Sequence, residues 1–73
     1  MRIGIGAGRD IGKVLVAAGR AGPGIQVSCF TSREHAGDLR DPALVVSDRP
    51  EEALVKALME GRIDAAVRGS LPA

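Results

Sequence analysis

The sequence predicts an α/β protein with a parallel four-stranded sheet whose strands are joined by crossover helices, in the order β-α-β-α-β-α-β. Three observations indicate this class. Short apolar runs recur along the 73 residues without the polar alternation of a strand that has one face in water. Stretches with apolar residues three and four positions apart separate these runs, as in helices. Clusters rich in Gly, Pro, Asp and Ser mark the turns between them.

The first strand and helix are predicted from the opening twenty residues. Residues 2–7 predict a strand, which ends at a glycine-rich turn. Asp10 is suited to cap a helix that extends to about Arg20. Gly22-Pro23-Gly24 makes any continuation unfavourable. The apolar face of this helix has the spacing i, i+3, i+4, i+7 in Ile11, Val14, Leu15 and Ala18.

The middle of the chain predicts two further strands. Residues 25–30 are compact and rich in β-branched side chains, which favours a strand. The polar residues 31–35 can begin a short helix, and residues 37–42 are typical of a turn. Residues 43–46 are apolar and suit a short buried strand.

The last helix and strand have the clearest signals. Asp48-Arg49-Pro50-Glu51 has the spacing of a capping box with proline in the first turn. Gly61 follows the helical pattern as a C-terminal cap. Residues 63–67 predict the fourth strand. With no helix after it, we expect a Rossmann-like but incomplete α/β domain: residues 1–73 are either a single domain or the N-terminal fragment of a larger one.

Composition excludes several classes of protein. Ten basic and nine acidic residues give a net charge of +1, which argues against binding to nucleic acid or to a membrane through a basic patch. No apolar run is long enough for a spanning helix, and no signal segment precedes the first strand. Cys29 has no second cysteine to pair with. These features predict a cytoplasmic protein.

Arginines follow each predicted strand. Because parallel strands deliver their outgoing loops to one edge, these side chains are expected at the carboxyl edge of the sheet, where open α/β folds bind ligands. Small polar residues and glycines accompany them, and such groups bind phosphate or carboxylate. The alternative is that they are solvated loop residues. The arginines in question are Arg9, Arg33, Arg49 and Arg68.

The glycines after the first strand resemble a dinucleotide fingerprint but miss it by one residue, since Gly6-Ala7-Gly8 is followed by three residues before Gly12. The second strand also lacks the acidic residue that would hold a ribose. Gly6 and Gly8 nevertheless suit a close approach of backbone to a ligand. A tight turn that needs a positive φ would explain them equally well.

No catalytic set and no metal site is predicted. His35 has no second histidine or paired cysteine to complete a metal site. Cys29 lies inside an apolar strand, where a thiol is usually inert. Asp64 lies at the opposite edge of the sheet and is expected to cap or to pair with Arg62. Asp10 and Asp48 are explained by helix capping.

The two ends of the chain resemble a known family. Met1-Arg2-Ile3-Gly4-Ile5-Gly6 and Gly61 to Leu71, which reads GRIDAAVRGSL, are similar to the MtxX-like methanogenesis marker family. Those archaeal proteins are methyltransferase-related subunits and are similar to the phosphate acetyl and butyryl transferases. The resemblance covers the chain but only the first part of a longer protein. It implies that Arg68, Gly69 and Ser70 help to form a phosphate or coenzyme pocket.

The sequence therefore favours binding of a phosphorylated or acyl-coenzyme small molecule, through Gly6, Gly8, Arg9, Arg68, Gly69 and Ser70. Whether the chain is an enzyme stays open, and no cofactor is indicated. One alternative is a non-enzymatic subunit that completes its sheet on a partner chain or in a homo-oligomer. Another is a lobe of a solute-binding protein, for which an export signal would be expected.

Overall fold

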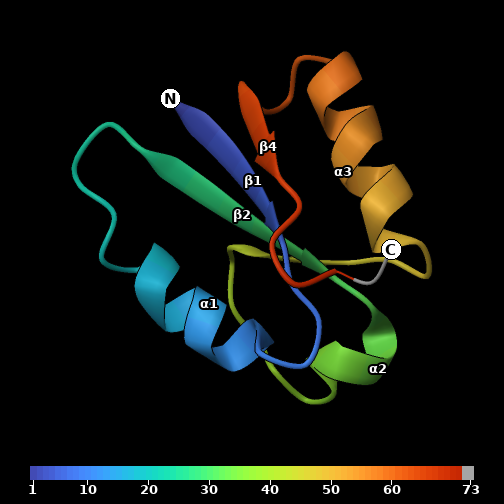
Figure 1. Cartoon of the computed structure of the whole chain (residues 1–73). Coiled ribbons are helices and arrows are strands. Elements are labelled where there is room, and N and C mark those ends of the chain that lie inside the picture. Colours follow the sequence, from blue (N-terminus) through green and yellow to red (C-terminus); the bar gives the residue numbers. More distant parts are fainter. Residues whose placement is uncertain (72–73) are drawn as a thin grey trace.

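A computed structural model describes residues 1–71 and shows an α/β fold with one four-stranded, all-parallel sheet (Figure 1). The strand order is β3-β2-β1-β4. This order matches the first four strands of the doubly wound dinucleotide-binding fold, so the Rossmann-like prediction is confirmed at the level of topology. The elements are β1 (Arg2–Gly6), α1 (Ile11–Ala18), β2 (Gln26–Thr31), α2 (Arg33–Ala36), β3 (Leu44–Val46), α3 (Pro50–Met59) and β4 (Ala65–Val67).

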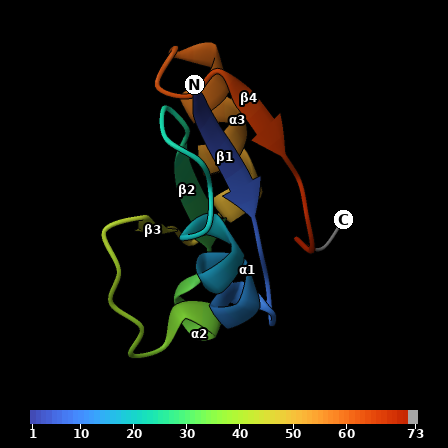
Figure 2. The ribbon, with the colours of Figure 1, turned by 90° about the vertical axis from the view of Figure 1, so that its left-hand side faces the viewer.

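Helices α1 and α3 cover opposite faces of the sheet (Figure 2). The core is accordingly divided into two small clusters. On the α3 face, Phe30 packs with residues of α3 and of the segments on either side of β4. On the α1 face, Cys29 packs with Ala7 and Ile11. Cys29 and Phe30 are adjacent in β2 and thus pack on opposite faces of the sheet, because successive side chains of a strand alternate between its faces.

The start of each long helix differs from its prediction. Asp10 occupies the N-cap position of α1, but its carboxylate makes no capping hydrogen bond. In α3 the N-cap position is held by Arg49, with Pro50 in the first turn, so the predicted capping box at Asp48 does not form. Ser47 Oγ instead accepts from Arg49 N–H at 3.1 Å. The side chain that accepts from the turn before α3 is therefore that of Ser47, one residue earlier than the sequence pattern suggested.

The predicted end of α3 is confirmed. Gly61 has a φ of 75°, and its N–H donates to Leu58 O at 3.2 Å. Arg62 N–H donates to Ala57 O at 2.9 Å. These two bonds form a Schellman motif, which ends the helix and turns the chain towards β4. The short helix expected near residues 31–35 is also present as α2, with Ser32 Oγ accepting from His35 N–H at 3.3 Å.

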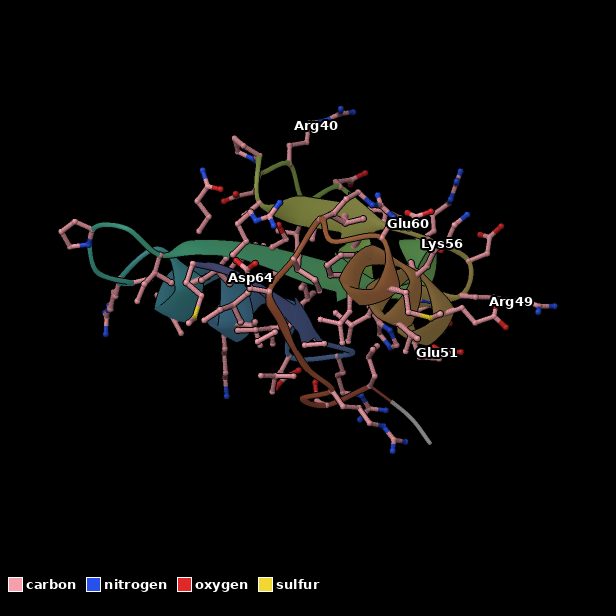
Figure 3. All side chains as sticks on the ribbon, turned by 90° about the horizontal axis from the view of Figure 1, so that it is seen from above. Arg40, Arg49, Glu51, Lys56, Glu60 and Asp64 are labelled. Carbon is pink, nitrogen blue, oxygen red and sulfur yellow. The ribbon has the colours of Figure 1, made fainter. Side chains whose placement is uncertain are left out.

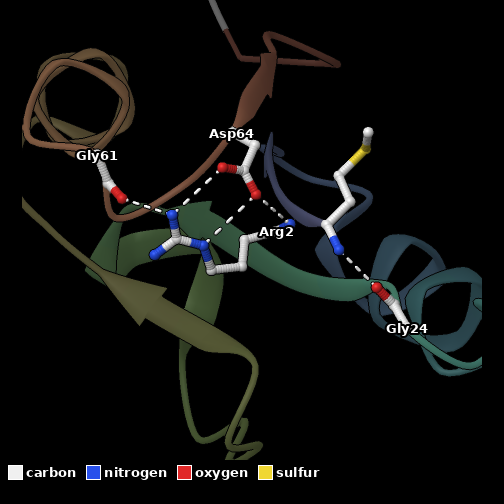
Figure 4. A network of polar contacts seen from close by, with 5 residues as sticks. Arg2, Gly24, Gly61 and Asp64 are labelled. Carbon is white, nitrogen blue, oxygen red and sulfur yellow. Dashed lines mark hydrogen bonds and ion pairs between the residues drawn. The ribbon is translucent and has the colours of Figure 1, made fainter.

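The amino edge of the sheet is fastened by Arg2 and Asp64, not by the expected Arg62 and Asp64 pair (Figure 4). Asp64 Oδ2 accepts from Arg2 N–H at 2.7 Å, and Arg2 Nη2 lies 3.2 Å from Asp64 Oδ1. The same Nη2 donates to Gly61 O at 2.6 Å. Arg62 pairs with Glu60 instead. Because Ile3 pairs with Ala65, the register brings Arg2 beside Asp64, which the sequence could not show.

Strand β4 is an edge strand that pairs with β1 alone. Gly4 faces α3, since a Cβ there would meet Leu54 and Ile63. Its neighbour Ile5 therefore faces the α1 side, and so does Val67, its partner in the register. Val67 is 50% exposed, because α1 packs against β2 and leaves this part of the sheet uncovered.

Candidate functional site

The carboxyl edge of the sheet brings together the loops that follow β1 and β4. These strands are neighbours, but β1 continues through α1 to β2 on its other side. Such a reversal of strand order is where open α/β sheets bind ligands. The segment after β4 crosses over the end of β1 (Figure 1). A site at this edge is therefore built from residues about 60 positions apart.

A hydrogen-bonded link at Ser70 joins the two loops. Ser70 Oγ accepts from Gly8 N–H at 3.0 Å and donates to the carboxylate of Asp10. Beside this link lies an open hollow of about 420 Å³. It is lined by Arg9, Asp10, Lys13 and Ser70. Within residues 1–71, Arg9 and Lys13 take part in no side-chain hydrogen bond or ion pair, so both cations are available to a ligand.

Of the six residues predicted as the site, three belong to this hollow or its link. Arg9 and Ser70 line it, and Gly8 donates to Ser70. Gly8 is buried, between Ser70 O and the ring of His35. Arg68 is exposed on the adjacent loop but does not line the hollow. The sequence thus indicated both loops that meet at the hollow, the one after β1 and the one after β4.

Gly6 and Gly69 are explained by contact between the two loops. A Cβ at Gly6 would lie 2.7 Å from Arg68 O and would collide with the side chain of Leu71. Gly69 has a φ of 60°, and a Cβ there would overlap Gly6 O. These glycines allow the loop after β4 to lie directly on β1. The close approach at Gly6 and Gly69 is therefore between two segments of this chain.

The four arginines of the carboxyl edge do not line one hollow. Arg49 pairs with Glu52 at 3.2 Å and belongs to a separate hollow beside α3. Seen from above, its side chain extends outward from the α3 side of the molecule (Figure 3). Arg33 is exposed on α2. Only Arg9 of the four lines the hollow that contains Ser70.

Sequence reasoning missed three polar residues at or near this site. Capping is a sufficient explanation of Asp10 in the sequence, and no local motif indicates Lys13. The sequence suggests no role for His35 beyond an incomplete metal site, yet its Cε1 lies 3.7 Å from where a Cβ of Gly8 would be. Its Nδ1 lies 2.9 Å from Ser32 Oγ. For Lys13 the available signal was its place in the first turn of the helix after a glycine-rich loop.

Cys29 has the surroundings of an inert thiol. It is fully buried in β2, and burial raises the pKa of its thiol, with a further increase from the carboxylate of Asp41. A raised pKa disfavours the reactive thiolate. Across residues 1–71, no group of three or more His, Cys, Asp or Glu side chains is arranged to hold a metal ion.

No helix within residues 1–71 has the length and apolar character needed to cross a membrane. Comparison with known proteins adds no relative: no family model, no curated protein and no solved structure matches this chain. The geometry of the carboxyl edge is therefore the structural basis for assigning a function.

Proposed function

We propose that this protein binds a small molecule with a phosphate or acyl-coenzyme group at the carboxyl edge of its sheet. The observation that carries the proposal is the hollow beside Ser70, which lies where the strand order reverses. Arg9 and Lys13 supply two positive charges there against one negative charge from Asp10, which leaves a net charge of +1 in the hollow. An anionic group is attracted by this surplus.

The first turn of α1 adds to the attraction. Lys13 lies in that turn, close to the positive end of the helix dipole, so the helix and the side chain favour the same charge in a ligand. The hollow is open, and exposed ion pairs contribute little. We therefore expect inorganic phosphate alone to bind with a Kd of about 1 mM or weaker.

The family resemblance supports the same edge of the sheet. The positions that it carries over, Arg68, Gly69 and Ser70, form the loop that lies on β1. On this proposal the chain is a cytoplasmic transferase-related subunit, from an archaeal methanogenesis context, that forms a full active site only in a larger assembly. Methyl or acyl transfer is the activity that the resemblance implies.

Titration with inorganic phosphate and with coenzyme A, followed by ¹⁵N–¹H correlation spectra, tests the proposal. Amide signals of the loops after β1 and β4 should shift. Arg9→Gln should weaken binding about three- to fivefold, the loss of one exposed ion pair. Arg68→Gln should also weaken it if the loop contacts the ligand as the resemblance implies. Arg20→Gln, at the far end of α1, is the matched control. Unchanged spectra in the wild-type protein would refute the proposal.

A second candidate function is that of a non-enzymatic subunit that completes its sheet on a partner or on a second copy. Its support is Val67, half-exposed on an edge strand that pairs with β1 alone. An edge strand presents free backbone donors and acceptors to another chain. Sedimentation velocity at micromolar concentration tests the version with a second copy, because a folded monomer throughout would exclude self-assembly as its role.

A further inference from the structure

Asp10 is placed unusually for an aspartate at the start of a helix. An aspartate at the N-cap position ordinarily accepts from a backbone N–H in the first turn. Here the carboxylate makes no such bond and instead accepts the hydroxyl proton of Ser70. The group is thus directed to the hollow and already bonded to a hydroxyl donor.

The hollow binds a bare anion less well than its two cations alone would. Arg9 and Lys13 attract phosphate, but the carboxylate of Asp10 on the same wall repels it. A ligand that carries a hydroxyl next to its phosphate avoids this conflict, because the hydroxyl donates to Asp10 while the phosphate contacts the cations. Hydrogen bonds to a charged acceptor are among the stronger ones in proteins.

From this arrangement we infer that the ligand is a phosphate ester of a polyol, such as a sugar phosphate or the ribose phosphate of a nucleotide, with Asp10 accepting one of its hydroxyls. The inference rests on the proposed function and names the substrate class of the same hollow. It makes Asp10 the residue that distinguishes such esters from inorganic phosphate.

Ser70 shows which bonds the ligand hydroxyl would make. Its Oγ donates to Asp10 and accepts from Gly8 N–H at 3.0 Å. A ligand hydroxyl has the same donor and acceptor capacity, so it can replace Ser70 without leaving either partner unsatisfied. The exchange conserves the number of hydrogen bonds. The contacts of the phosphate with Arg9 and Lys13 then favour the bound state.

Titrations with ribose 5-phosphate, inorganic phosphate and ribose test the inference, with the ¹⁵N–¹H spectrum as the readout. The wild-type protein should bind ribose 5-phosphate about tenfold more tightly than inorganic phosphate, because the ribose hydroxyl at Asp10 keeps the phosphate away from the carboxylate and so reduces their repulsion. Ribose alone should cause no shift at the same concentrations. Asp10→Asn should bind inorganic phosphate more tightly than the wild type and lose most of the tenfold preference. Asp38→Asn, an exposed aspartate outside the hollow, should change neither.

Ser70→Ala provides a second measurement that does not alter the charge. It removes the group that competes for Asp10, so both the affinity for ribose 5-phosphate and the preference over inorganic phosphate should rise. Equal affinity of the wild-type protein for the two phosphates would overturn the inference and leave the proposed function standing. Retention of the full preference in a folded Asp10→Asn variant would overturn it too. Absence of shifts with either phosphate would refute the proposed function as well.

Discussion

At the scale of single residues, Arg2 and Asp64 connect three parts of the amino edge. The Asp64 carboxylate accepts from the backbone and the guanidinium of Arg2, and that guanidinium also donates to Gly61 O (Figure 4). Asp64 N–H donates to Arg2 O at 2.7 Å, which continues the ladder between β1 and β4. This exposed pair thereby links the first strand, the end of α3 and the last strand.

The pH dependence of stability follows from the pKa of Asp64. The backbone N–H of Arg2, followed by its side chain, lowers the pKa of this carboxyl below its ordinary value. A lowered pKa in the folded state means that ionised Asp64 stabilises the protein at neutral pH. This contribution is lost as the pH falls below about 4 towards the lowered value.

Asp64→Asn should therefore lower the melting temperature slightly at pH 7, and its difference from the wild type should shrink as the pH falls below about 4. Melting followed by circular dichroism between pH 2 and 7 measures this. The matched control is Asp38→Asn, an exposed aspartate that makes no side-chain bond within residues 1–71. A difference that stays constant over this range would contradict the assignment.

The residues of the hollow show how far sequence reasoning reaches. A glycine-rich turn after a strand correctly indicated Gly8 and Arg9 as residues of the carboxyl edge. The bond between Gly8 and Ser70 joins positions 62 apart, and its geometry depends on the strand order. Asp10 had a sufficient local explanation as a cap, and only the fold shows that its carboxylate is used elsewhere. Local sequence patterns therefore predict which residues lie in the loops, whereas the hydrogen bonds between the loops are seen only in the structure.

At the scale of elements, helix ends were predicted well where glycine determines them and poorly where a side chain does. The end of α3 depends on a positive φ, which glycine adopts without strain, so the position of Gly61 was decisive. The start of α3 offered two side-chain acceptors at adjacent positions, and the backbone N–H of Arg49 donates to Ser47 and not to Asp48. Propensity alone does not separate such near-equivalent caps.

Gly61→Ala isolates the contribution of the left-handed turn. A Cβ at Gly61 would touch nothing within 4 Å, so the cost is conformational, about 1–2 kcal/mol of unfolding free energy. The matched change Gly12→Ala, in helical conformation and also with open space around the Cβ, should stabilise by about 0.5–1 kcal/mol. Urea unfolding followed by circular dichroism measures both. The prediction fails if the two substitutions act in the same direction.

At the scale of the whole molecule, the sheet is stabilised by one small hydrophobic cluster on each face. Phe30 is the only aromatic residue, and the cluster on the α1 face contains three buried residues. A chain of 73 residues buries about 60–65% of its unfolded surface, so little of the molecule is far from water. The alternation of helices and strands was sufficient to predict the layers. The Rossmann-like prediction agrees with the observed strand order, and the lack of a helix after the last strand indicated an uncovered side. Which residues of β1 and β4 pair was not predictable, because it depends on the register.

The thiol of Cys29 provides a test of whether these clusters unfold together. It is 0% exposed at the centre of the sheet, and its pKa is raised, so a thiol reagent can react only after the chain opens. For a free energy of unfolding of about 4 kcal/mol, the low end for a chain of this length, the reaction should be about a thousandfold slower than that of an exposed cysteine. Val16→Cys in a Cys29→Ala background supplies that exposed reference, since Val16 is 59% exposed.

Labelling of Cys29 with a disulfide reagent across urea concentrations should give the same slope as global unfolding if the two layers are cooperative. A slope near zero, with fast labelling in water, would show instead that the α1 layer opens on its own, and the hollow at the start of α1 would then open with it.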